Sequence, residues 1–255
     1  MPGIPLQQSI VYGPVFSRRL GRSLGINLLP KDRKVCSFNC VYCEYGDTGE
    51  CTLQPSADGL PSVEDVLHGV EKALQKPRTI ETITFSGNGE PTLHPDFLEI
   101  VLGVIGIREK YRPEAKLAVL SNSSTSMESH ILAALERIDM PIMKLDAGEI
   151  ITFQKVNQPA EDIIFEDIQK GLKTLKGLII QSALIDGINS NTHGEAYENW
   201  ASALAELNPC QVQIYSTDRP TSQMDVLRVS PVRLRKIEND LRTRFHLEAT
   251  AYWRE

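Results

Sequence analysis

Three cysteines near the start of the chain lie close enough in sequence to bind one metal cluster. They are Cys36, Cys40 and Cys43, in the run Cys-Ser-Phe-Asn-Cys-Val-Tyr-Cys, so three residues separate the first pair and two separate the second. Cysteine thiolates hold [4Fe–4S] clusters, which normally take four of them. Three thiolates from one loop would leave one iron open, and an open iron is a place where a small molecule can bind and react.

Two other uses of these cysteines fit the sequence less well. A structural zinc site takes four ligands, usually from two separated Cys-x-x-Cys pairs, and the chain has no second pair. The odd count of five cysteines and the lack of an export signal disfavour a disulfide scaffold. Cys51 could be a fourth ligand, whereas Cys210 follows a proline and is expected to be a small buried apolar residue.

The cysteine run, the aromatic Tyr42 before its last cysteine and its place near the amino terminus resemble the radical S-adenosylmethionine (radical SAM) enzymes. This resemblance implies that Cys36, Cys40 and Cys43 hold a [4Fe–4S] cluster whose open iron binds S-adenosylmethionine. An electron from the cluster then splits the sulfonium to give a 5′-deoxyadenosyl radical. The resemblance also implies an external one-electron donor of the flavodoxin or ferredoxin type.

A glycine-rich segment, Gly87-Asn88-Gly89-Glu90, is the second candidate site. Its two glycines free the backbone for close approach to a ligand such as a small amino acid. It resembles the Gly-Gly-Glu segment with which the family binds the amino group of S-adenosylmethionine, although Asn88 replaces the middle residue. Gly87, Asn88, Gly89 and Glu90 are therefore expected to bind the cofactor. Taken alone, the segment could equally be a strand-to-helix turn.

Asn122 and a lysine–aspartate pair follow two further apolar runs. Asn122 matches a polar residue that contacts the cofactor in the family, but it could equally cap the next helix. Lys144 and Asp146 lie two apart on a predicted strand and would point the same way, into the barrel. Buried charges are costly unless paired or functional. We therefore expect contact with substrate or cofactor, with an inward salt bridge as the alternative.

Arg219 is the third charged candidate. It lies in the run Thr217-Asp218-Arg219-Pro220, directly after a predicted strand. A guanidinium there could clamp a carboxylate or a phosphate with two hydrogen bonds. The alternative is a structural Arg–carboxylate pair within the turn.

The rest of the sequence predicts the frame that positions these groups. Apolar, β-branched runs alternate with segments of helical spacing, as in repeated β–α units around a parallel sheet. Strands are predicted at residues 24–29, 82–86, 117–121, 142–146, 178–185 and 212–216, with one more candidate at 247–252. Helices are predicted at residues 63–75, 95–110, 127–138, 161–175, 195–207 and 231–245. These elements indicate an α/β fold, a partial (β/α)6 TIM-like barrel.

We expect one domain over residues 1–255, with the cluster loop at 36–43 and the segment 231–255 packed on the barrel. In such folds functional groups gather at the carboxyl ends of the strands. Polar groups from all six strand ends, including residues 186–189 after the fifth strand, should therefore meet at one opening.

Composition limits the class of function. The chain has 255 residues, of which 41% are hydrophobic, enough for one sizeable core. No apolar run approaches the ~18 residues needed to span a bilayer, so we expect no membrane association and a cytoplasmic location. The net charge of −6 does not support a surface built for RNA, although basic residues between Arg18 and Lys34 could meet a phosphate-bearing substrate.

Longer stretches resemble a subgroup of stand-alone radical SAM proteins related to the wyosine-synthesis enzymes of transfer RNA. They are residues 13–25, the cluster loop, and residues 144–147 and 215–220. Wyosine enzymes carry a second cysteine set upstream, yet no cysteine precedes Cys36 here. The substrate is therefore left open as an RNA base or a metabolite.

Two other functions fit parts of the sequence. One is an activase that abstracts hydrogen from a glycine of a partner protein, since such activases are similarly short. The other, of a different class, is a non-catalytic iron–sulfur electron carrier or sensor. A carrier has no use for a glycine-rich segment or a polar-lined opening, and it should not cleave S-adenosylmethionine.

Overall fold

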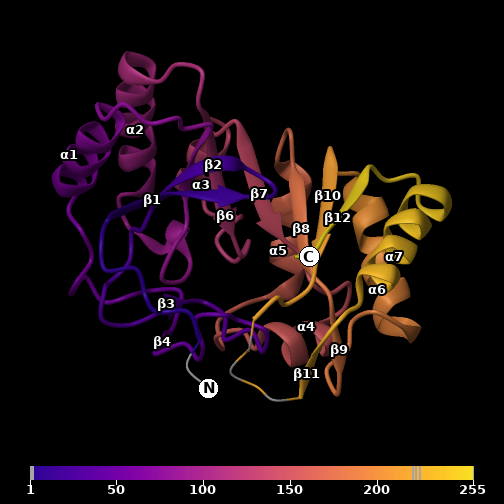
Figure 1. The fold of residues 1–255 in the computed structure, drawn as a ribbon. Coiled ribbons are helices and arrows are strands. Elements are labelled where there is room, and N and C mark those ends of the chain that lie inside the picture. The colour runs from indigo at the N-terminus through magenta and orange to yellow at the C-terminus, as the bar shows by residue number, and fades with distance from the viewer. Residues whose placement is uncertain (1–2, 220, 222, 224, 255) are drawn as a thin grey trace.

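A curled sheet of eight strands forms the centre of the computed structural model, which describes residues 3–219, 221, 223 and 225–254 (Figure 1). In chain order the strands are β1 (Val11–Ser17), β2 (Gly21–Ile26), β5 (Thr82–Phe85), β6 (Lys116–Ser121), β7 (Met140–Lys144), β8 (Ile179–Ala183), β10 (Gln211–Tyr215) and β12 (Ala249–Tyr252). They lie in this same order across the sheet. β1 and β2 form an antiparallel hairpin, and every other neighbouring pair is parallel. The predicted α/β fold, a partial TIM-like barrel, is confirmed.

Helices connect the parallel strands and cover the outer face of the sheet. They are α1 (Val63–Leu74), α2 (Phe97–Tyr111), α3 (Ser129–Leu135), α4 (Ile150–Asn157), α5 (Phe165–Thr174), α6 (Gly194–Leu207) and α7 (Pro231–Arg244), with a short 3-10 helix η1 (Pro91–Leu93). Figure 1 shows α1 and α2 outside one end of the sheet and α6 and α7 outside the other. Such crossovers are what parallel strand pairs require.

The main apolar core lies between the sheet and these helices, and α1 shows how the sequence builds it. Val66, Val70 and Leu74 recur every four residues and are all fully buried. The helix begins after Ser62, whose hydroxyl accepts a hydrogen bond from the backbone N–H of Asp65 (3.1 Å). Local capping and apolar spacing together fix where the helix starts and which face it buries.

The turn between β1 and β2 packs against the inner side of the sheet. Leu20 in this turn is buried against Ala118 of β6 and Ile142 of β7. Arg18, in the same turn, reaches the carboxylate of Asp218 beyond β10 (2.5 Å). The hairpin therefore joins the first part of the sheet to the last.

Most of the predicted elements are present, and the differences are local. All six predicted strands lie in the sheet, and β12 is the additional strand expected at residues 247–252. The sheet thus has seven parallel strands rather than six, plus the antiparallel β1. Neither β1 nor α4 was predicted. In the carboxyl-terminal segment, β12 pairs with β10 and α7 contributes to the main core.

Two short strand pairs lie outside the main sheet. β3 (Val35–Cys36) pairs with β4 (Glu50–Cys51) beside the cluster loop, and β9 (Ile185–Gly187) pairs with β11 (Val226–Arg228). Pairing with β11 carries residues 186–189 away from the opening where they were expected. Among the described residues, no helix is both long enough and apolar enough to cross a membrane.

Candidate functional site

A cavity of about 700 Å³, the main cavity, opens at the carboxyl ends of the parallel strands. Its wall brings together the cluster-loop cysteines, the glycine segment after β5, Asn122 after β6, Lys144 at the end of β7 and residues 215–219 around the end of β10. Residues 186–189 are absent from the described wall, so the predicted meeting of six strand ends holds for the other five. A cavity of this size is typical of a site for a small molecule.

The three cysteines of the loop are free thiols that face this cavity. Two side-chain amides approach them: Nδ2 of Asn122 lies 3.5 Å from Sγ of Cys36, and Nδ2 of Asn157 lies 3.4 Å from Sγ of Cys40. Burial raises the pKa of the Cys36 thiol well above its usual range. Burial, together with nearby Asp146, raises the pKa of Cys40 to about 11. Without a ligand the thiol form is therefore favoured.

Lys34 supplies positive charge to the same loop. Its side chain is buried, and its ammonium group donates a hydrogen bond to the carbonyl of Gly46 (2.9 Å). Burial lowers the pKa of Lys34, but the nearby sulfurs of Cys43, Cys36 and Cys40 outweigh burial and raise it. Sequence reasoning took Lys34 as part of a basic stretch. Its position two residues before Cys36 was the signal that could have linked Lys34 to the cluster loop.

The glycine segment packs directly against the cluster loop. Gly87 and Gly89 have φ values of +137° and +141°, and a Cβ on Gly89 would lie 1.6 Å from the carbonyl oxygen of Val35. This close approach lets the Val35 N–H donate to the Asn88 carbonyl (3.0 Å) and the Glu90 N–H donate to the Val35 carbonyl (3.1 Å). The glycines thus join the two predicted motifs backbone to backbone.

The side chain of Asn88 has a different role from the one expected. It is fully buried and does not form part of the described cavity wall. Its Nδ2 donates to the carbonyls of Gln7 (3.0 Å) and Pro30 (2.8 Å), and its Oδ1 accepts from the Gln7 N–H (2.7 Å). Asn88 therefore ties the amino-terminal segment to the glycine segment.

Glu90 lies on the cavity wall and is held by its neighbours. Its Oε1 accepts from the hydroxyl of Thr92 (2.6 Å), and its Oε2 accepts from the backbone N–H of Asn122 (2.5 Å). Burial raises the pKa of Glu90, and these hydrogen bonds offset only part of that effect. The backbone of Asn122 thereby contacts the glycine segment, and its side chain contacts Cys36. It also accepts from the Ser124 N–H (3.0 Å) in the turn after β6, but α3 begins only at Ser129 with Glu128 at its N-cap position, so the helix-cap alternative is wrong.

Lys144 and Asp146 form the inward ion pair that the sequence left as an alternative. β7 ends at Lys144, so the two residues do not share a strand; Nζ of Lys144 nevertheless lies 3.4 Å from Oδ1 of Asp146. Asp146 also accepts from the Tyr42 hydroxyl, from Asn157 Nδ2 (2.7 Å) and from the Ala183 N–H (2.7 Å). Lys144 lines the cavity, whereas Asp146 lies behind it.

Arg219 lines the main cavity, as expected, with about half of its side chain exposed. Its Nη1 lies 3.8 Å from Oε2 of Glu44, just after the cluster loop, so its partner is not within the turn. The neighbouring Asp218 instead accepts from Arg18 (2.5 Å) and contacts Arg228 (3.0 Å). Pro220, the last residue of the quoted run, lies outside the described residues.

Comparison with known proteins identifies the family. Residues 34–213 match the model of the Radical SAM superfamily. This chain belongs to that superfamily. A UPF0026 protein of Helicobacter pylori is 33% identical over 218 residues, which are 84% of this chain and 68% of that protein. The predicted family membership is confirmed.

Two solved structures share the radical SAM fold of this chain. A radical SAM methyltransferase from Sphaerobacter thermophilus has a TM-score of 0.67 and 17% identity, and the match covers 93% of this chain and 67% of that one. TYW1 with a lysine–pyruvate adduct bound has a TM-score of 0.59 and 15% identity, covering 87% of this chain and 73% of that one. At these identities the likeness establishes the partial barrel.

The two remaining cysteines lie away from the radical SAM cavity. Cys51 pairs with Cys36 in the β3–β4 register, but its side chain is exposed and is not part of the described wall. Cys210 is also exposed, so the expectation of a buried apolar residue is wrong. It lies after Pro209 at the amino end of β10, whereas the cavity opens at the carboxyl end of that strand.

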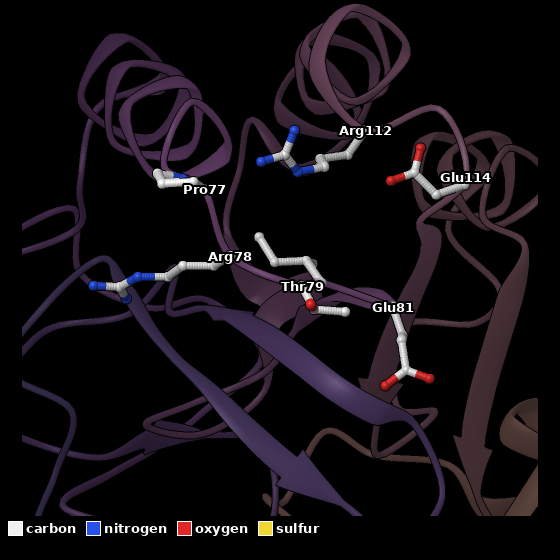
Figure 2. A pocket seen from close by; sticks show the side chains of 7 residues that line it. Pro77, Arg78, Thr79, Glu81, Arg112 and Glu114 are labelled. Carbon is white, nitrogen blue, oxygen red and sulfur yellow. The ribbon is translucent and has the colours of Figure 1, made fainter.

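A second hollow, of about 540 Å³, lies at the amino ends of β5 and β6, at the far end of the radical SAM barrel from the cysteines (Figure 2). Its charged groups hold loops together. Arg112 donates to the carbonyls of Tyr111 and Lys76 (both 2.7 Å), and Glu81 accepts from the Arg22 N–H (2.8 Å). This hollow is a junction of connecting segments rather than part of the candidate site.

Proposed function

We propose that this chain is a radical SAM enzyme that uses a [4Fe–4S] cluster and S-adenosylmethionine to remove hydrogen from a substrate. The observation that carries the proposal is the joint placement of three free thiols and a glycine segment on one cavity. When bound, the cluster supplies the electron, and S-adenosylmethionine supplies the radical, that this chemistry needs.

The residues present fit such a cluster. In the described part of the chain, no three His, Cys, Asp or Glu side chains converge on a point that could hold a single metal ion. The thiols of Cys36, Cys40 and Cys43 instead lie on the wall of one cavity, where each could bind a different iron of a cube. The amides of Asn122 and Asn157 beside two of the sulfurs support this reading, because hydrogen bonds to sulfur tune iron–sulfur centres.

The remaining residues of the site bind and position. Lys34 would balance the negative charge of the thiolates when the cluster is loaded. Gly87, Gly89 and Glu90 would hold the amino acid part of S-adenosylmethionine, because they line the cavity directly beside the loop. Lys144 and Arg219, which also line the cavity, would meet polar groups of the substrate. The packed wall would keep water away from a reactive radical.

The alternatives fit the site less well. An electron carrier gains nothing from a cavity of about 700 Å³ whose wall includes charged groups from several strand ends. An activase must admit a loop of a partner protein, whereas the charged groups of Lys144 and Arg219 on the cavity wall are better suited to a smaller polar substrate. Within the radical SAM family, we favour a metabolite or an RNA base as substrate. The electron donor is proposed to be a flavodoxin or ferredoxin, and the location the cytoplasm.

The first test measures iron and S-adenosylmethionine cleavage in one set of variants. Anaerobically reconstituted protein should contain one [4Fe–4S] cluster and, after reduction, release 5′-deoxyadenosine and methionine without added substrate. Cys40→Ala should lose the iron and the activity, whereas the matched variants Cys51→Ala and Cys210→Ala should keep both. Iron retained in Cys40→Ala would contradict the ligand assignment. An intact cluster that never yields 5′-deoxyadenosine would favour the carrier or sensor.

A further inference from the structure

Arginines gather where the β1–β2 turn meets the ends of β10 and β12. Asp218 is 11% exposed and contacts two of them, Arg18 (2.5 Å) and Arg228 (3.0 Å). Arg244 on α7 has the opposite arrangement, because its one guanidinium group contacts two carboxylates, those of Glu198 and Asp240. One carboxylate between two guanidinium groups leaves positive charge uncompensated, on a chain whose net charge is −6.

Two further arginines extend this positive surface. Arg19 lies over the ring of Tyr215 (4.7 Å to the centroid) and near that of Tyr252 (6.0 Å). Arg254 is exposed at the end of the described chain and lines the main cavity. Neither guanidinium group has a carboxylate partner among the residues that the structure describes, although the backbone N–H of Arg254 donates to Asp218 (3.4 Å). The nearby Glu238 is already paired with Arg242 (3.1 Å).

Arg18 and Arg254 lie between two hollows. Beside the main cavity lies an outer hollow of about 510 Å³, lined by Arg18, Ala251, Tyr252, Trp253 and Arg254. Arg18 and Arg254 line both spaces. A ligand that reaches from one hollow to the other must therefore pass two guanidinium groups and lie beside two aromatic rings.

We infer that the outer hollow binds a nucleoside phosphate portion of the substrate, while the part that reacts lies in the main cavity. This inference rests on the proposed function, because it takes the main cavity as the site of reaction. Arg18, which shares Asp218 with Arg228, and Arg254, whose guanidinium has no carboxylate partner among the described residues, are suited to phosphate oxygens, which guanidinium groups bind with paired, charge-assisted hydrogen bonds. The ring of Tyr252 and the face of Trp253 that Arg235 does not cover offer stacking surfaces for a base. Phosphate and base together define a nucleotide, either free or within RNA.

The test is direct binding to the reconstituted holoprotein. Uridine 5′-monophosphate is titrated by calorimetry, with uridine as the phosphate-free comparison and hexauridylate as the polymer. Tryptophan fluorescence gives a local readout, because Trp253 lines the outer hollow whereas Trp200 is fully buried. We expect the monophosphate to quench Trp253 and to bind about tenfold more tightly than uridine.

Charge variants then locate the phosphate. Arg18→Gln and Arg254→Gln, at the two guanidinium groups that line the outer hollow, should each weaken binding of the monophosphate about tenfold without changing that of uridine. Arg137→Gln removes the same charge from an exposed position after α3 that lines neither hollow, and should change neither binding constant. Equal binding of uridine and its monophosphate, or unchanged binding in both variants, overturns the inference.

The polymer distinguishes the two sources of phosphate. Tighter binding of hexauridylate, with a steep salt dependence, assigns the phosphate to RNA, whereas equal binding assigns it to a free nucleotide. Both outcomes uphold a nucleoside phosphate site. Because binding needs no electron, nucleotide binding without 5′-deoxyadenosine formation would overturn the proposed function alone. Cleavage of S-adenosylmethionine without nucleotide binding would overturn only this inference.

Discussion

Asp146 accepts hydrogen bonds from Tyr42 and Asn157 while it faces the ammonium group of Lys144 at 3.4 Å. Its side chain is 0% exposed, and that of Lys144 is 17% exposed. Burial lowers the pKa of Lys144, but the attraction of Asp146 outweighs burial and raises it. Lys144 is therefore a cation at neutral pH rather than a free amine, and it can position a ligand but not attack one.

Removing the charge of Lys144 should destabilise the protein. Lys144→Met leaves the buried carboxylate of Asp146 without its cation, so we expect the free energy of unfolding to fall by about 3 kcal/mol. Urea unfolding at neutral pH measures this change. Lys155→Met, on the exposed face of α4, is the matched control and should cost less than about 0.5 kcal/mol.

A double variant separates charge from packing. Lys144→Met with Asp146→Asn should recover part of the lost stability, because no unpaired charge then remains buried. A double variant less stable than Lys144→Met would show that shape and hydrogen bonding, rather than charge, set the cost.

At the scale of single residues, the sequence identifies those whose role follows from their spacing in a short motif. The cysteine run and the two glycines are of this kind, and both face the main cavity. Asn157 is not, because an asparagine at the end of a helix has no distinguishing pattern until the fold brings it to Cys40 and Asp146. The role of Asn88 was missed for the same reason, since its partner Gln7 lies 81 residues away.

Helix α4 is the element that places Asn157 against the cluster loop. Phe153 packs between Phe38 of that loop and Phe165 of α5, with ring centroids 5.2 and 4.8 Å apart. Backbone hydrogen bonds reinforce the contact, including one from the N–H of Val41 to the carbonyl of Val156 (3.0 Å). The first turn of this helix therefore matters for the geometry of the site.

Glu149 caps that first turn, and its loss should weaken the helix. Its carboxylate accepts from the backbone N–H groups of Ile151 and Thr152 (both 2.6 Å). Partial burial opposes ionisation, but the hydrogen bonds from Thr152 and Ile151 outweigh it and lower the pKa of Glu149. Glu149→Ala should cost about 1 kcal/mol in urea unfolding at neutral pH.

The pH dependence of this cost follows from the lowered pKa. Because the folded state favours the ionised form, the contribution is complete above the usual value of 4.5 and is lost as the pH falls through the lowered folded value. The difference between wild type and Glu149→Ala should therefore shrink below about pH 4.5. Glu161→Ala, an exposed carboxylate, serves as the control, and an equal loss in both variants would refute the cap.

Elements with strong periodicity could be predicted, and short or interrupted ones could not. The parallel strands and most helices are long, apolar patterns that local sequence largely decides. β1 was missed because Gly13 and Pro14 interrupt it, and a bulge between Tyr12 and Val15 accommodates them. α4 was missed because its eight residues begin Ile-Ile-Thr, which favours a strand, and its packing on Phe38 overrides that preference.

The whole molecule is an open barrel whose two ends are joined by few contacts. The sheet runs from β1 to β12 without closing, and the β1–β2 turn crosses toward β10 and β12 (Figure 1). Asp218 is the centre of this junction, because it binds Arg18 of the turn and Arg228 of β11. No sequence pattern predicts a pair 200 residues apart. The charge balance of the junction can therefore be seen only in the folded molecule.

If Asp218 fastens the hairpin, then its neutralisation should loosen the junction while the rest of the barrel stays intact. Asp218→Asn keeps the shape but weakens two ion pairs, so we expect a loss of about 1 kcal/mol in unfolding free energy. Hydrogen exchange should accelerate in residues 11–26 and 226–228 and stay unchanged in α1 and α2. Glu198→Gln, which weakens the exposed pair with Arg244, is the matched control and should leave the hairpin protected. Unchanged exchange in residues 11–26 of Asp218→Asn would mean that pairing with β2 alone holds the hairpin, and that the arginine junction serves the ligand rather than the fold.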